Sequence, residues 1–321
     1  MKITVIGCGR WGSLITWYLN RRGHEMTLYG RESSPHMQAF LKTRENGLLT
    51  LQPEVRLSTD QNCVDDAEVI IISINSQGLR ALLRDHLAPR ALQNKTVVLC
   101  MKGIEISTGK RLSEVAAECL PSTCAVAVWL GPGHVQEFYA GIPNCMVIDS
   151  EDEETKRMLV DRFSSELIRF YYGEDMIGNE VGAAAKNVIG IAAGILDGLS
   201  LSTLKGALMS RGCREVARLI SAMGGKELSA YGLCHLGDYE ATVFSKFSHN
   251  RAFGELLVKG EKMDKLAEGF YTVKALMGLC ERFRVDMPIC RAVYEIVHCG
   301  KDARETIVAL FERSIKNEFY K

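Results

Sequence analysis

The chain has 321 residues, 47% of them hydrophobic, and its 39 basic and 39 acidic side chains balance to a formal charge of zero. This composition can bury a large core, and the length indicates about two domains of ~150 residues each. A balanced charge favours neither a nucleic-acid-binding nor an anionic-membrane-binding surface.

The eleven cysteines are scattered and odd in number, without a Cys-x-x-Cys pair or a Cys/His cluster. We therefore expect free thiols in a reducing cytoplasm, with no disulfide and no metal site. No signal peptide is expected, because the first apolar run ends in glycines rather than in a cleavage site. The longest apolar window, residues 181–196, is broken by Lys186 and Asn187 and is predicted to be too short to cross a bilayer.

A strand, a glycine turn and a helix are predicted at the start of the chain. The β-branched residues 3–6 precede Gly7-Cys8-Gly9-Arg10-Trp11-Gly12, and residues 13–22 are rich in Leu, Ile, Trp and Tyr. In this setting, Gly-x-Gly-x-x-Gly lets the backbone and the helix N-terminus approach a pyrophosphate. The motif predicts a dinucleotide site, and a simple tight turn is the alternative.

The second predicted strand, residues 26–29, ends at Gly30-Arg31 without an acidic residue. An acid at this place would bind the ribose 2′-hydroxyl of NAD, whereas an Arg accommodates the 2′-phosphate of NADP. Arg31 therefore favours NADP over NAD, although Glu32 is adjacent and an ordinary exposed Arg or dual use is the alternative.

Further apolar runs predict strands that alternate with helices over residues 68–74, 96–101, 124–130, 145–149 and 168–172. This alternation is typical of an α/β, doubly wound, mostly parallel sheet of the Rossmann type. Ligands of such sheets bind beyond the carboxyl ends of the strands. The candidates there are Asn75-Ser76-Gln77, Lys102-Gly103 and Gly131-Pro132-Gly133.

Long segments at helical spacing, such as residues 204–223 and 265–284, follow residue 180. We expect a dinucleotide-binding domain over residues 1–178 and an all-α substrate-binding domain over residues 179–321. An apolar helix near this boundary carries Lys186. Its side chain either extends to water or sits in a partly dry site, where desolvation lowers the pKa and suits the amine to proton transfer.

The order of motifs resembles the NAD(P)-dependent glycerol-3-phosphate dehydrogenases over essentially the whole chain. The resemblance rests on the N-terminal Gly-x-Gly-x-Trp-Gly, Lys102-Gly103-Ile104-Glu105, Gly131-Pro132, Lys186-Asn187-Val188-Ile189, Asp197-Gly198-Leu199, Ser210-Arg211-Gly212, Leu236-Gly237-Asp238, Asn250-Arg251 and Glu268-Gly269. It implies a cytoplasmic enzyme that transfers hydride between a nicotinamide cofactor and dihydroxyacetone phosphate or glycerol 3-phosphate and feeds glycerophospholipid synthesis. It also implies a homodimer formed through the helical domain.

The resemblance also implies roles for individual residues. Lys186 matches the acid–base Lys, Lys102 a second active-site Lys in contact with substrate and cofactor, and Asp238 a residue that orients the ammonium group or, alternatively, a turn acid. The remaining substrate contacts would be Gly131, Gly133, Thr242, Ser248, His249 and Asn250. The remaining cofactor contacts would be Gly7, Gly9, Arg10, Trp11, Gly12, Arg31, Val135 and Glu268. For Trp11, the alternative is a core residue at the start of the helix.

Three positions depart from the family pattern. Ser248-His249-Asn250 replaces Ser-Arg-Asn, Gly133 replaces a Ser, and residues 200–208 lack an Asp-Asn step. Arg is always charged and binds phosphate through two donors, whereas His is charged only in part at neutral pH. Arg251 is the candidate substitute for the missing Arg. A paralogue that reduces another small phosphorylated or phosphonylated carbonyl compound is therefore one alternative. A non-catalytic nucleotide-binding regulator is another, which Lys102, Lys186 and Asp238 argue against.

Overall fold

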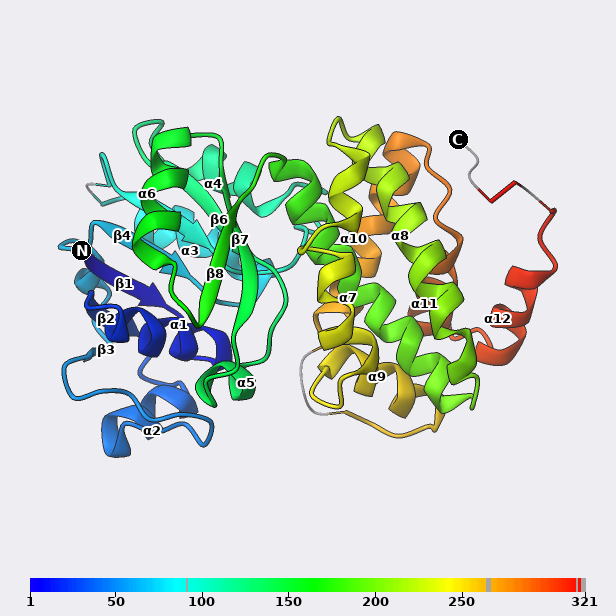
Figure 1. Cartoon of the computed structure of the whole chain (residues 1–321), viewed down its shortest axis with the longest axis horizontal. Helices are drawn as coiled ribbons and strands as arrows, with labels where there is room; N and C mark the ends of the chain where they lie inside the picture. The colour runs from blue at the N-terminus through cyan, green and yellow to red at the C-terminus, as the bar shows by residue number, and fades with distance from the viewer. Residues whose placement is uncertain (91, 264–266, 316, 319–321) are drawn as a thin grey trace. The chain divides into compact units, whose positions relative to one another are not determined.

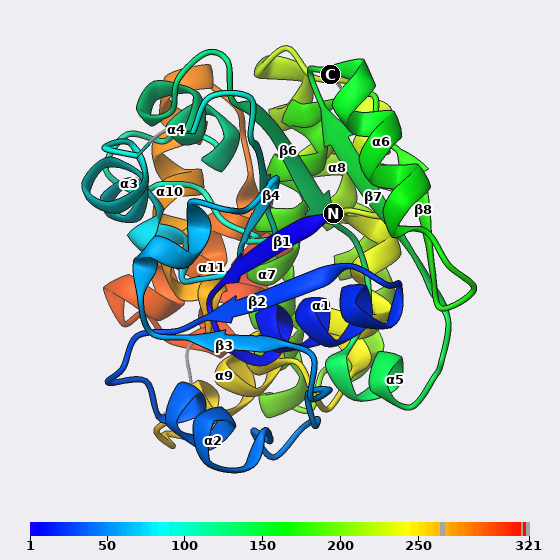
Figure 2. The ribbon, with the colours of Figure 1, turned by 90° about the vertical axis from the view of Figure 1, so that its left-hand side faces the viewer.

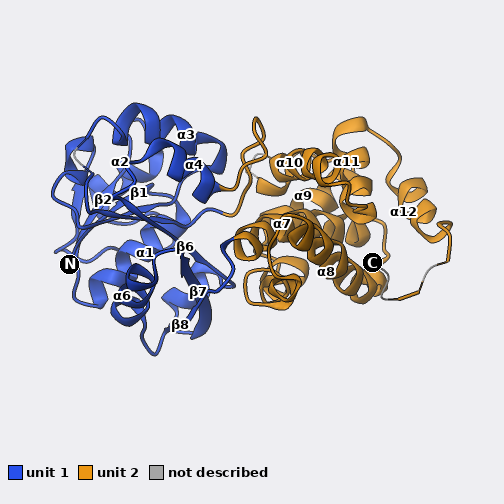
Figure 3. Ribbon diagram, turned by 90° about the horizontal axis from the view of Figure 1, so that it is seen from above, with its two compact units in different colours: residues 1–101, 112–176 blue, residues 102–111, 177–321 orange. Residues whose placement is uncertain are grey.

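The structure is a computed structural model of the chain and describes residues 1–90, 92–263, 267–315 and 317–318. The chain divides into two compact units (Figure 3). Unit 1 comprises Met1–Met101 and Leu112–Met176, and unit 2 comprises Lys102–Arg111 and Ile177–Lys321. The segment Lys102–Arg111 thus groups with the helical part of the chain, which the sequence does not indicate.

The described residues of unit 1 contain an eight-stranded sheet with the order β3-β2-β1-β4-β5-β6-β7-β8 (Figure 2). Every neighbouring pair is parallel except β6 with β7. The first six strands follow the order of a dinucleotide-binding fold, which confirms the expected fold class. The strands are β1 Lys2–Ile6, β2 Glu25–Tyr29, β3 Arg56–Ser58, β4 Val69–Ile72, β5 Thr96–Leu99, β6 Ala125–Leu130, β7 Asn144–Ser150 and β8 Ile168–Tyr172.

Helices cover both faces of this sheet, with α1 and α6 on one face and α3 and α4 on the other (Figures 2 and 3). Strands buried on both faces are expected to be continuously apolar, and β4 and β5 are buried along their whole length. The helices of unit 1 are α1 Arg10–Arg21, α2 Pro35–Thr43, α3 Leu79–Leu82, α4 Leu112–Cys119, α5 Val135–Tyr139 and α6 Glu153–Phe163.

Unit 2 is helical and has a hydrophobic core of its own, centred on α7 (Figure 1). Its helices are α7 Met176–Gly198, α8 Lys205–Ala222, α9 His249–Val258, α10 Glu268–Phe283, α11 Pro288–Cys299 and α12 Ala303–Phe311. A 3₁₀ turn, η6 Leu236–Asp238, and a π-helical turn, η7 Glu240–Phe244, lie between α8 and α9 in the chain. The expected helix over residues 204–223 corresponds to α8. The one over residues 265–284 corresponds to α10, although Lys265 lies outside the described residues.

Helix α7 is longer than the apolar window in the sequence. At 23 residues, it is the one helix among the described residues that is long and apolar enough to cross a membrane by length and composition, because it extends beyond the window of residues 181–196 at both ends. Of its most apolar window, 89% is buried inside the protein. This burial is that of a core helix in a soluble protein, because a membrane span would expose its apolar side chains to lipid.

Candidate active site

The glycine turn after β1 has a backbone that only glycine fits at two of its three positions. Gly7 adopts φ +113°, and a Cβ there would lie 2.1 Å from the Ser73 carbonyl oxygen. A Cβ at Gly12 would lie 1.9 Å from the Gly7 carbonyl oxygen. A Cβ at Gly9, in contrast, would meet nothing within 4 Å. Gly7 and Gly12 are therefore required for the turn and for packing, whereas Gly9 leaves open space at the N-terminus of α1, as a pyrophosphate needs.

Three further residues predicted to contact the cofactor follow the first two strands of unit 1: Arg10 and Trp11 come after β1, and Arg31 comes after β2. Helix α1 begins at Arg10, so Arg10, Trp11 and Gly12 belong to the helix rather than to the turn before it. Arg10 donates to Gln136 Oε1 at 3.1 Å, and the Trp11 ring lies 6.0 Å from that of Phe138. Arg31 is exposed two residues beyond β2, where the 2′-substituent of an adenine ribose is expected.

The turn after β6 explains one departure from the family pattern. Gly131 and Gly133 adopt φ of +132° and +138°. A Cβ at Gly133 would lie 2.2 Å from the ring of Phe138. A Ser would be strained in this backbone, so the local structure itself requires glycine here. Val135, the first residue of α5, is buried.

Lys186 lies in the middle of α7 and its residue is 8% exposed, so the side chain does not extend to water. Its Nζ donates to Thr242 Oγ1 at 2.8 Å and lies 3.0 Å from Asp238 Oδ2. The Thr242 hydroxyl in turn donates to the Asp238 carbonyl oxygen at 2.7 Å. The turns η6 and η7 thus present one carboxylate and one hydroxyl to the amine, which occupy two of its three N–H donors.

Lys102 forms an ion pair with the same carboxylate, that of Asp238. Its Nζ donates to Asp238 Oδ2 at 2.5 Å, and Asp238 itself is only 1% exposed. The Lys102 side chain is 21% exposed, more than that of Lys186 at 10%. One buried carboxylate therefore holds two ammonium groups, and the arrangement carries a net positive charge in a largely dry setting.

Burial is the largest influence on the pKa of Lys186 and lowers it, the Asp238 carboxylate raises it, and the neighbouring Lys102 ammonium lowers it again, with a net value of about 8. A pKa near 8 lets the amine both donate and accept a proton close to neutral pH. This is the property required of a general acid–base catalyst.

Amide side chains connect Lys102 to the start of α9. Asn187 Nδ2 donates to the Lys102 carbonyl oxygen at 3.2 Å, and Asn250 Nδ2 donates to Asn187 Oδ1 at 3.0 Å. Asn250 Oδ1 accepts from the Gly269 backbone N–H at 2.9 Å, next to Glu268 at the start of α10. The sequence drew attention to Asn187 as a polar residue in an apolar helix without giving it a role, and this chain of amides supplies one.

Ser248 caps α9 by accepting from the Arg251 backbone N–H at 3.2 Å, and His249 and Asn250 form the first turn of that helix. Arg251, the candidate substitute for the missing family Arg, contacts two carboxylates of unit 2. Its guanidinium donates to Asp197 at 2.9 Å and to Glu255 at 2.8 Å. Both carboxylates hold it in a partly buried position within unit 2.

A buried histidine supports the turn that carries Asp238 and was not singled out from the sequence. His235 Nδ1 lies 2.8 Å from the Gly182 carbonyl oxygen, and its Nε2 lies 2.8 Å from the Tyr239 hydroxyl. Burial lowers the pKa of His235 to about 4, so this ring is neutral at physiological pH. A fully buried His with two partners joins α7 to η6 without adding charge to the site.

The described residues contain no group of three or more His, Cys, Asp or Glu that could hold a metal ion, and all eleven cysteines are free. Among these residues the structure brings together Lys102, Lys186, Asp238 and Thr242. A buried amine with a pKa near neutrality and a second ammonium can protonate and stabilise an oxygen that gains negative charge.

Comparison with known proteins gives a consistent result over both units. Residues 2–156 match the N-terminal part, and residues 175–308 the C-terminal part, of the NAD-dependent glycerol-3-phosphate dehydrogenase family. The chain is 35% identical over 332 residues to a glycerol-3-phosphate dehydrogenase [NAD(P)+] of Thermoanaerobacter sp. (strain X514), covering 100% of this chain and 99% of that protein. It is 36% identical over 337 residues to the protein of the same name from Chlorobium phaeobacteroides (strain BS1), covering 99% of each.

Among solved structures, the glycerol-3-phosphate dehydrogenase of Coxiella burnetii superposes with a TM-score of 0.92 at 28% identity, covering 97% of this chain and 99% of that one. The similarity therefore extends over the sheet, the helices and the motifs alike. This chain belongs to the NAD-dependent glycerol-3-phosphate dehydrogenase family of oxidoreductases.

Proposed function

We propose that this protein transfers hydride between NAD(P)H and dihydroxyacetone phosphate, forming sn-glycerol 3-phosphate, and catalyses the reverse reaction. The observation that carries the proposal is the Lys186 amine, which is buried, has a pKa of about 8 and is held by Asp238 and Thr242. Reduction of a ketone places negative charge on oxygen, and a nearby ammonium group stabilises that charge and then donates a proton to it.

In this reaction, Lys186 gives a proton to the carbonyl oxygen during reduction and removes it during oxidation. Its third N–H donor, beyond those directed at Asp238 and Thr242, serves the substrate oxygen. Lys102 adds positive charge beside it, and Asp238 keeps both ammonium groups in place. Thr242 fixes the direction of the Lys186 side chain.

The glycine turn is suited to a dinucleotide, because the missing Cβ of Gly9 faces open space at a helix N-terminus. Gly7, Gly9, Arg10, Trp11 and Gly12 would hold the cofactor, together with Val135, Lys102 and Glu268. When bound, NADPH or NADH supplies the hydride. Arg31 favours NADP, since an Arg at this place accommodates the 2′-phosphate.

The substrate phosphate is assigned to Ser248, His249 and Asn250, with Gly131 and Gly133 as further substrate contacts. A second candidate substrate, another small phosphorylated or phosphonylated carbonyl compound, is favoured by His249. A His in place of an Arg removes a permanent charge and a two-donor contact, which weakens phosphate recognition by roughly ten- to hundredfold.

We further propose that the enzyme works in the cytoplasm, where its product feeds glycerophospholipid synthesis, and that it is a homodimer associating through the helical unit. The buried α7 and the reduced cysteines are compatible with that location. Light scattering coupled to size-exclusion chromatography measures the mass directly, and a mass near 35.6 kDa would exclude the dimer.

The test of the activity is to mix the purified protein with dihydroxyacetone phosphate and NADPH or NADH and to follow the absorbance of the reduced nicotinamide. Absence of oxidation at saturating substrate refutes the first substrate, and oxidation with only another phosphorylated ketone or aldehyde establishes the second. Lys186→Ala should lower kcat by at least about a hundredfold, because it removes the general acid, while nucleotide binding persists. A near-normal rate would exclude Lys186 from the mechanism.

A further inference from the structure

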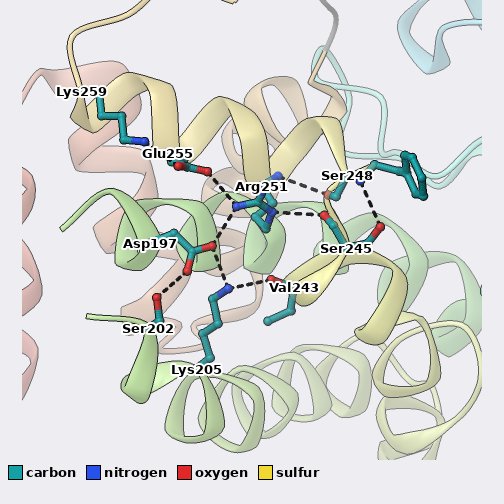
Figure 4. A network of polar contacts seen from close by, with 10 residues as sticks. Asp197, Ser202, Lys205, Val243, Ser245, Ser248, Arg251, Glu255 and Lys259 are labelled. Carbon is teal, nitrogen blue, oxygen red and sulfur yellow. Dashed lines mark hydrogen bonds and ion pairs between the residues drawn. The ribbon is translucent and has the colours of Figure 1, made fainter. Parts of the chain in front are cut away.

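Arg251, the third residue of α9, forms a polar network at the edge of the candidate phosphate site (Figure 4). Its Nε donates to the Ser245 carbonyl oxygen at 3.1 Å. Its Nη1 donates to Asp197 Oδ2 at 2.9 Å and to Glu255 Oε2 at 2.8 Å. The Arg251 side chain is 15% exposed, so most of this side chain is removed from water.

Asp197 is itself held by two further groups. Lys205 Nζ donates to Asp197 Oδ2 and Ser202 Oγ to Asp197 Oδ1, both at 2.7 Å. Burial alone would raise the pKa of Asp197, but these hydrogen bonds and the one from Arg251 hold it below the ordinary value. Lys205 also donates to the Val243 carbonyl oxygen at 3.1 Å, next to the Thr242 that contacts Lys186.

The backbone between η7 and α9 depends on the same contacts. Ser248 N donates to the Ser245 carbonyl oxygen at 3.3 Å, the acceptor that Arg251 Nε also uses. The Ser248 hydroxyl accepts from the Arg251 backbone N–H. The backbone of Arg251 is also close to α7, because a Cβ at Gly194 would lie 1.9 Å from the Arg251 carbonyl oxygen. Side chain and backbone of Arg251 thus fix the same four-residue turn.

We propose that Arg251 is a positioning residue, held in place by Asp197. It fixes the turn of residues 245–248 and the start of α9. In this arrangement Ser248, His249 and Asn250 face the substrate phosphate. The inference deepens the function proposed above and rests on it. In this role Arg251 does not bind the phosphate itself. Its Nε and Nη1 already donate to one carbonyl oxygen and two carboxylates, so a two-donor contact of the guanidinium with the phosphate would have to break some of these charge-assisted contacts.

The two roles predict opposite effects of Asp197→Asn. If Arg251 positions the turn, weakening its anchor raises the KM for dihydroxyacetone phosphate and the inhibition constant of inorganic phosphate, as Arg251→Ala also does. If Arg251 binds phosphate directly, releasing it from Asp197 lowers both constants or leaves them unchanged. Inorganic phosphate is the probe because it reports on the phosphate contacts alone.

We expect Arg251→Ala to raise both constants by about tenfold or more, the consequence of losing charged hydrogen bonds, with kcat changed by less than about threefold. Asp197→Asn should act in the same direction, and the double variant should be no worse than Arg251→Ala, since the two residues act as a unit. Lys259→Ala is the matched control. Lys259 donates to Glu255 at 2.6 Å from the exposed side of the network and should change neither constant.

Arg251→Lys keeps the experiment decisive if Arg251→Ala does not fold. Lysine retains the positive charge but lacks the planar guanidinium group that contacts Ser245 and Asp197 at the same time, so both constants should rise by a smaller factor than in Arg251→Ala. The positioning role would be overturned if Arg251→Lys and Asp197→Asn left the KM and the inhibition constant unchanged. It would also be overturned if the variants lowered kcat and the stability of the protein without changing either constant. If the unmodified enzyme oxidises no nicotinamide with the substrate, it is the proposed function that fails. Phosphate binding to the variants, measured by calorimetry, then still decides the role of Arg251.

Discussion

Asp238→Asn is the change that most directly tests the electrostatics of the candidate site. The Asp238 carboxylate is 1% exposed, and its Oδ2 lies 3.0 Å from Lys186 Nζ and 2.5 Å from Lys102 Nζ. Asparagine keeps the shape of the side chain and removes the negative charge. Two ammonium groups then face each other in a buried site without a counter-charge, which favours the neutral form of the Lys186 amine.

The size of the effect follows from the distance. Two unit charges 3.0 Å apart interact by about 5 kcal/mol at an effective dielectric constant of ~20, which corresponds to a pKa change of about 4. The amide dipole of Asn and rearrangement of the site offset much of this interaction. We therefore expect the pKa of Lys186 to fall from about 8 by at least about one unit.

The assay is the pH dependence of kcat for ketone reduction, which requires the protonated amine. In the unmodified enzyme the rate should decrease as the pH rises through about 8, and the rate of alcohol oxidation, which requires the neutral amine, should increase through the same value. In Asp238→Asn both transitions should move to lower pH. Thr242→Val, the control, removes a hydrogen bond but no charge and should lower the rate while leaving the transition near 8. A transition that stays at about 8 in Asp238→Asn would refute the electrostatic reasoning.

Three further predictions concern the phosphate, the cofactor and the packing of unit 2. His249→Arg should lower the KM for dihydroxyacetone phosphate by about tenfold, because it restores a permanent two-donor charge; an unchanged KM would show that residue 249 does not contact the phosphate. Arg31→Ala should raise the KM for NADPH much more than that for NADH, and equal losses would mean that Arg31 does not recognise the 2′-phosphate. Gly194→Ala should lower the Tm by several degrees or prevent folding, since its Cβ would lie 1.9 Å from a carbonyl oxygen, whereas Gly206→Ala, with nothing within 4 Å, should not.

Much of the fold was predictable from local patterns. Strands β1, β2 and β8 appear within one residue of their apolar runs, because buried parallel strands are continuously apolar. Strand β3, Arg56–Ser58, was missed, since three residues at the sheet edge form no apolar run. The runs around β4 and β5 were predicted too long, because apolar residues such as Ile74 and Met101 continue into the loops beyond Ile72 and Leu99, where the two strands end.

The sequence indicated which residues form the candidate site, but not which contacts they make. The motifs indicated Lys102, Lys186, Asp238 and Thr242, and the structure brings these four together. The structure also shows that Arg251 contacts Asp197 and that the turn after β6 holds Gly133 at φ +138°, where a Cβ would meet the ring of Phe138. Neither conclusion could come from the sequence, because each depends on residues far away along the chain or on a backbone angle.

The sequence by itself determined the two-part organisation, the dinucleotide motif and the identity of the polar residues in an apolar helix. These features depend on periodicity and spacing, which are local properties of the chain. Only the tertiary structure decided whether Lys186 reaches water. Its burial and the distances to Asp238 and Lys102 arise when α7, η6 and the segment Lys102–Arg111 pack together, and it is this packing that brings the pKa of the amine close to neutrality.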